Sequence, residues 1–86
     1  MIGPEKLEEI TKHLCEDIDK ADDIYALYTA EDRAKGAADI LLYLELITKF
    51  GHSGMITRID TAVMIAQAHI DGKELHNDSG CGNDRP

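Results

Sequence analysis

The feature of this sequence that most constrains its fold is the recurrence of apolar residues at three- and four-residue steps in separate segments. Because a helix has 3.6 residues per turn, such steps place side chains on one helical face. The pattern predicts an all-α, antiparallel three-helix domain. The stripe in the first segment comprises Leu7, Ile10, Leu14, Ile18, Ala21, Tyr25 and Tyr28, and the stripe in the last comprises Ile56, Ile59, Val63, Ala66 and Ile70.

Residues that favour helix ends set the expected boundaries. Pro4 suits a first helical position, because its missing N–H would have no partner there. Thr29 resembles the start of a capping box, and Ser53 can cap a later helix. Gly51 and Gly72 are the residue type that most readily takes the left-handed conformation after a helix. The predicted helices therefore span residues about 4–28, 30–50 and 54–71.

The last fourteen residues differ in composition from the rest of the chain. Residues 73–86 contain one strongly apolar residue, Leu75, among Gly, Asn, Asp, Ser and Pro. Such a segment buries too little surface to offset the entropy lost on ordering. We expect a single helical domain over residues 1–72 and a flexible polar tail.

The second predicted helix is apolar around most of its circumference. Glu45 is its only charged residue from Ile40 to Ile47, and a helix of this kind is normally buried on several sides. We therefore expect it to be central. Leu42 and Leu46 lie away from the stripe that the other helices can cover, so the tail, a bent third helix, a second copy or a partner's groove must cover them. We expect a homodimer, and the predicted oligomer interface consists of Ala38, Leu42 and Leu46.

The negative charge is concentrated at the beginning of the chain. The net charge is −8; residues 1–32 hold ten acids and three lysines, a net charge of −7. This charge disfavours direct binding to nucleic acid or to a membrane surface, since both are anionic. The start lacks the features of a secretory signal, and no stretch approaches the ~18 apolar residues of a spanning helix. We expect a cytoplasmic protein in which Cys15 and Cys81 are free thiols.

The candidate metal and catalytic motifs are incomplete. Asp17 and Asp19 begin like a calcium loop of the EF-hand type, but Ala21 and Asp22 stand where an oxygen ligand and a glycine are needed. The histidines and cysteines lack the spacings typical of zinc sites. No nucleophile motif or phosphate-binding loop is present. We expect no metal, no cofactor and no enzymatic activity.

The charge distribution leads to the main functional hypothesis. An acidic helix facing water attracts a basic protein surface, so we predict a non-enzymatic regulator or inhibitor. Its partner could be a nucleic-acid-handling protein, as in phage counter-defence. In one alternative the acids only keep the chain soluble, and the function is homo-oligomeric assembly; in another, a dimer seam binds a small ligand such as a nucleotide. The predicted partner-binding residues are Glu9, Glu16, Asp19, Asp22 and Asp23.

Overall fold

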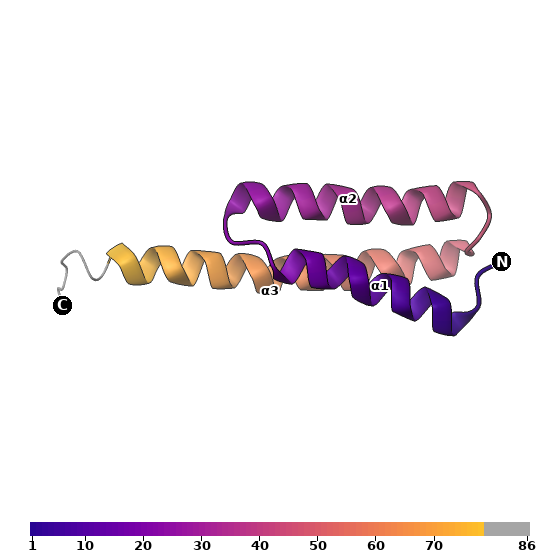
Figure 1. Cartoon of the computed structure of the whole chain (residues 1–86), viewed down its shortest axis with the longest axis horizontal. Coiled ribbons are helices and arrows are strands. Elements are labelled where there is room, and N and C mark those ends of the chain that lie inside the picture. The colour runs from indigo at the N-terminus through magenta and orange to yellow at the C-terminus, as the bar shows by residue number, and fades with distance from the viewer. Residues whose placement is uncertain (79–86) are drawn as a thin grey trace.

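Residues 1–78 form three α-helices that pack side by side (Figure 1). This computed structural model describes the backbone of residues 1–78 and the side chains of residues 1–72. The helices are α1 (Pro4–Asp19), α2 (Ile24–Tyr43) and α3 (Lys49–Asp78). Helix α2 runs antiparallel to the other two, and each helix contacts both of its neighbours. The predicted all-α, antiparallel three-helix fold is confirmed.

The first boundary differs from the prediction, because the helix expected over 4–28 is interrupted after Asp19. Asp23 has extended backbone, and its carboxylate Oδ1 accepts a hydrogen bond of 2.8 Å from the Ala26 N–H. An aspartate in this position satisfies a helix-start donor that otherwise has no partner. Helix α2 therefore begins at Ile24 rather than at 30. Thr29, the predicted cap, lies inside α2 and donates to the Tyr25 carbonyl.

This interruption removes two tyrosines from the predicted core stripe. The chain changes direction between α1 and α2, so the three- and four-residue steps no longer continue along one face. Tyr25 is 81% exposed, and Tyr28 is 49% exposed. Only the part of the stripe within α1 and the following turn faces the core, with Ile18 fully buried.

Helix α2 also ends earlier than predicted, at Tyr43 instead of residue 50. The Glu45 N–H donates to the Leu42 carbonyl, and the Leu46 N–H donates to the Leu41 carbonyl, both at 2.9 Å. These two bonds form a Schellman motif, which satisfies carbonyls at the helix end. Glu45 takes the left-handed conformation, with φ of 59°. Gly51, the predicted stop, lies instead in the first turn of α3.

Helix α3 starts and ends beyond its predicted limits of 54 and 71. Thr48 rather than Ser53 caps it, since the Thr48 hydroxyl accepts a 3.0 Å hydrogen bond from the Gly51 N–H. At the other end the helix passes through Gly72, where glycine costs about 1 kcal/mol relative to alanine but does not prevent a helix. Residues 73–78 of the predicted tail are helical and extend beyond the α1–α2 turn (Figure 1). Residues 79–86 lie outside the described part of the chain.

The left-handed Glu45 gives a direct test of the α2–α3 turn. We expect Glu45→Gly to stabilise the protein by about 0.5–1 kcal/mol. The left-handed conformation costs an L-residue about 1–2 kcal/mol, of which the greater freedom of glycine in the unfolded chain offsets a part. The free energy of unfolding from urea titration measures the change. Glu9→Gly is the control, and we expect it to destabilise the exposed interior of α1 by about 1 kcal/mol. Destabilisation by both changes would contradict the turn geometry.

The core consists of two neighbouring clusters, and α3 contributes to both. Ile18, Leu27 and Ile59, one from each helix, are fully buried in the first. The second contains Ala38, Ile47 and Met55. The predicted stripe of the last helix is confirmed, since its members are buried or packed against the clusters. The prediction that the second helix is central is wrong, because α3 supplies most of the buried side chains while the α2 residue Ile40 is 57% exposed.

Polar side chains link the helices at the edges of the core. Glu8 of α1 pairs with Arg58 of α3. Asp39 of α2 contacts His52 of α3 at 2.7 Å. Lys35 of α2 lies 2.8 Å from Glu31 and 3.0 Å from Asp60 of α3, and its hydrogen bonds to these two carboxylates raise the pKa of the Lys35 ammonium group. Exposed pairs of this kind contribute little energy individually.

Candidate functional site

Helix α1 separates its apolar and anionic sides as the sequence predicts. Thr11 and Ile18 are buried, and the other apolar residues of the helix are partly buried against the two clusters. Glu9 and Glu16 are exposed on the opposite side, and Asp19 is exposed on the flank between the two sides. At 1.5 Å per residue, Glu9 and Asp19 are about 15 Å apart along the helix axis. Helix α1 therefore presents an acidic ridge to water.

The carboxylates of the ridge have weak local partners. Lys6 Nζ lies 3.4 Å from Glu9 Oε1, and His13 Nδ1 lies 3.7 Å from Glu16 Oε1. Both pairs are exposed, and exposed pairs are typically worth 0–1 kcal/mol. An incoming cation can therefore displace the local partner at small cost.

The predicted binding residues do not all share one surface. Asp19 and Asp22 line the same cleft at the α1–α2 turn, whereas Glu9 and Glu16 lie farther back along α1. Asp23 holds the start of α2 through its hydrogen bond to Ala26, so it has a structural role. Replacing such a cap by alanine costs about 1 kcal/mol.

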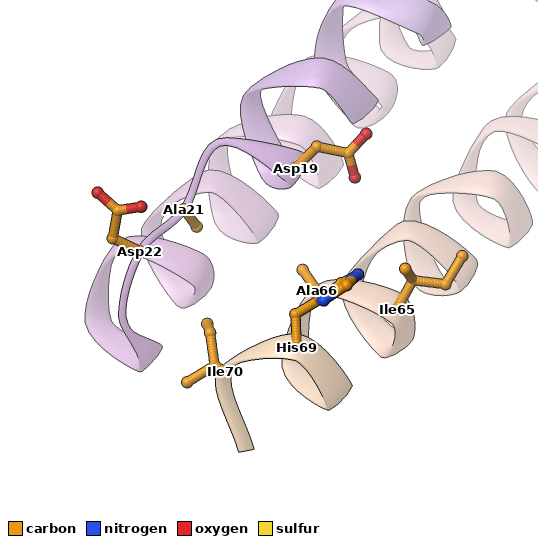
Figure 2. A pocket seen from close by; sticks show the side chains of 7 residues that line it. All are labelled: Asp19, Ala21, Asp22, Ile65, Ala66, His69 and Ile70. Atoms are coloured by element: carbon orange, nitrogen blue, oxygen red, sulfur yellow. The ribbon is translucent and has the colours of Figure 1, made fainter. Parts of the chain in front are cut away.

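The cleft lies between the α1–α2 turn and the C-terminal half of α3, and its volume is about 460 Å³ (Figure 2). Its apolar part comes mainly from α3, where Ile70 is buried and Ile65 is 53% exposed. In Figure 2 the Asp19 carboxylate lies on the side of α1 that borders α3, and Asp22 extends outward from the turn. The full lining comprises Asp19, Ala21, Asp22, Ile65, Ala66, His69 and Ile70.

This combination of walls suits a long basic side chain. The alkyl stem of an arginine or lysine can pack against Ile65 and Ile70 while its charged end reaches a carboxylate. Neither Asp19 nor Asp22 belongs to an ion pair within residues 1–72. Sequence reasoning missed the contribution of His69 and its neighbours, because only the packing of α3 against the turn brings them beside Asp19.

The described titratable groups near the cleft do not form a metal site. Among the residues that the structure describes, no group of three or more His, Cys, Asp or Glu side chains could hold an ion. Asp17 and Asp19 lie within α1 and not in a loop. Cys15 has no disulfide partner among the described residues, and Cys81, the other predicted free thiol, lies outside them. Burial raises the pKa of the Cys15 thiol; Arg58 opposes this shift, and Asp19 and Glu8 reinforce it. The thiol is therefore protonated at neutral pH.

The predicted oligomer interface is not an exposed patch. Ala38 is completely buried inside the chain, so its assignment to an interface is wrong. Leu42 is half-buried against the cluster of Ala38, Ile47 and Met55. Leu46 is also half-buried, and its carbonyl accepts a 2.8 Å hydrogen bond from the Ile2 N–H. Leu46 follows the end of α2, where the chain turns back, and the assignment of Leu42 and Leu46 to an interface stays a prediction.

Comparisons with protein-family models, with curated proteins and with solved structures find no match to this chain. Over residues 1–78, none of the helices combines the length and the apolar character needed to cross a membrane.

Proposed function

We propose that this protein is a non-enzymatic, cytoplasmic regulator or inhibitor that binds a basic surface of a protein partner through its acidic ridge and the adjoining cleft. The observation that supports this most is the cleft itself. Two exposed carboxylates without ion-pair partners in the described residues stand beside an apolar wall of Ile65 and Ile70. A site of this kind receives the charged end and the alkyl stem of one arginine or lysine.

The ridge extends this site along α1. Glu16 lies one turn before Asp19, and Glu9 lies two turns farther back. A partner with basic residues spaced along a groove or helix can contact several of these carboxylates together. Because the acids are exposed, their main effect is on the rate of encounter, and binding weakens as salt increases. A nucleic-acid-handling protein has a surface of the required charge.

Charge reversal tests this proposal. We expect the triple variant Glu16→Lys/Asp19→Lys/Asp22→Lys to lose capture of basic proteins from a lysate at low salt. We leave Asp23 unchanged because its loss removes the cap of α2. Mass spectrometry identifies what the wild-type protein captures, and titration calorimetry with the purified partner measures the affinity, which we expect to fall at least about a hundredfold for three lost or reversed charge contacts.

A matched control carries the same change in net charge at other positions. Asp32→Lys/Glu45→Lys/Asp71→Lys alters three exposed acids away from the ridge and the cleft. We expect this control to retain most of the affinity. Equal loss in both triple variants would show that only net charge matters, and unchanged binding in both would show that neither net charge nor these positions matter. Either result would reject the ridge and cleft as the binding site.

A further inference from the structure

The outer face of α3 carries a second stripe at helical spacing, opposite the one that faces the core. Its residues follow one another at steps of four and three, so they lie along one line of the helix. All are exposed; Phe50 is 90% exposed and Met64 is 70% exposed. We call this line the outer stripe, and it consists of Phe50, Gly54, Thr57, Thr61, Met64 and Ala68.

The outer stripe contains no charged residue, although a solvent-facing helix surface normally carries several. The Thr57 hydroxyl donates to the Ser53 carbonyl and the Thr61 hydroxyl donates to the Thr57 carbonyl, each at 3.0 Å. Because each hydroxyl already donates to a carbonyl of its own helix, it needs no partner outside the helix. The threonine methyl groups can then pack against another apolar surface. The charged side chains nearest the middle of the stripe, Arg58 and Asp60, are paired with acids and bases of the same chain.

We propose that the outer stripe binds the outer stripe of a second copy of this chain, with the two α3 helices antiparallel. The sizes of the side chains identify a second copy as the occupant. When Thr57 of one copy is placed opposite Thr61 of the other, Gly54 faces Met64 and Phe50 faces Ala68. Each large side chain then meets a small one, and two-fold symmetry produces each of these two contacts twice in the dimer. A parallel pairing would instead place Phe50 against Phe50 and Met64 against Met64.

An apolar groove supports the same register. It has a volume of about 320 Å³ and lies between the N-terminal halves of α1 and α3, beside Phe50 and Gly54. A side-chain carbon added at Gly54 would meet nothing within 4 Å. In the antiparallel register, Met64 of the second copy lies over this open position. Leu7 and Met55 are among the residues that form the apolar surface there.

Charge and area are compatible with a weak dimer. Residues 49–72 hold two bases and two acids, so the segment that carries the stripe is neutral although each chain has a net charge of −8. An aromatic side chain buries about 150–250 Å², so the two copies of Phe50 alone cover on the order of 300 Å². With two methionines and the small residues between them, the contact is on the order of 1,000 Å², near the lower limit for a specific interface. We therefore expect dissociation in the micromolar range.

Sedimentation equilibrium over a range of concentrations tests the pairing. With increasing concentration, we expect the average mass of the wild type to approach twice the chain mass of 9.5 kDa. We also expect the association to strengthen with salt, because salt screens the repulsion between the anionic chains. Partner binding through the acidic ridge must show the opposite salt dependence, so failure of one proposal is distinguishable from failure of the other. A wild type that remains monomeric at high concentration and high salt would overturn the pairing and indicate a different occupant.

Two matched threonine variants locate the contact. Thr61→Glu places a charge near the two-fold axis, and we expect it to weaken dimerisation at least about a hundredfold. Thr29→Glu is the control, because Thr29 is an exposed threonine with the same bond to a carbonyl four residues earlier, but it lies on α2. We expect this control to dimerise like the wild type. Equal weakening by both changes would reject the outer stripe as the interface.

Cysteine cross-linking tests the register in the full chain with Cys15→Ala and Cys81→Ser. Gly54→Cys and Met64→Cys are made as separate proteins and oxidised alone and as a mixture. In the antiparallel register, identical positions are about 15 Å apart along the axis, too far for a disulfide, which requires Cα atoms within about 7 Å. We expect cross-linked dimers only in the mixture. Cross-linking of each variant with itself would indicate a parallel pairing, and its absence from the mixture would also overturn the proposal.

Discussion

Leu27→Ala is expected to destabilise the protein by about 3 kcal/mol, within the range of 2–5 kcal/mol for a fully buried leucine. Leu27 belongs to the cluster that joins all three helices, and its side chain is completely buried. Removing three carbon atoms there loses burial and leaves a cavity that the packed helices cannot fully close. For a domain of this size, the same change lowers the melting temperature by roughly 12–24 °C, at about 4–8 °C per kcal/mol.

Urea unfolding followed by circular dichroism measures the loss, and Leu44→Ala provides the control. Leu44 lies at the C-terminal end of α2 and is 56% exposed, so we expect its truncation to change the free energy of unfolding by no more than about 0.5 kcal/mol. If Leu27→Ala had as small an effect as the control, Leu27 would not lie between the helices, and the packing of α2 against α3 would be wrong.

The sequence predicted most reliably which face of each helix is buried in the core. In α3, Ile59 and the other apolar residues at helical steps are buried, because a helix with one continuous apolar stripe has only one way to remove it from water. The acidic side of α1 was predictable for the same reason. Patterning of this kind depends only on residues that are close in sequence, so it does not require knowledge of the tertiary packing.

The helix ends were harder to predict because several residues compete for the same role. Asp23 and Thr29 can both cap a helix, and the structure uses Asp23. At the other end of α2, Glu45 takes a left-handed conformation in which glycine is the usual residue, although Gly51 follows shortly afterwards. The residue after Glu45 also contacts a distant segment, because the Ile2 N–H donates to the Leu46 carbonyl. Such a contact between distant segments leaves no local signal.

The candidate site was therefore predictable only in part. The acidic character of Asp19 and Asp22 follows from the sequence, but the apolar wall beside them comes from Ile65 and Ile70 on another helix. The outer stripe of α3 illustrates a different problem. Its threonines and glycine are not hydrophobic by composition, and their suitability for packing depends on the hydroxyl bonds and on the side of α3 that the other helices leave uncovered.

Ala38→Leu is expected to destabilise the isolated chain by about 1–3 kcal/mol, because a larger side chain must displace its neighbours in a packed core. Ala38 is completely buried in the cluster with Ile47 and Met55. If Ala38 instead belonged to a contact between copies, as the sequence suggested, leucine would change dimerisation and leave the stability of the monomer almost unaffected. Urea unfolding at low protein concentration, combined with sedimentation, separates these outcomes. The control Ala26→Leu places the same side chain at an exposed position of α2, where we expect a change of no more than about 0.5 kcal/mol.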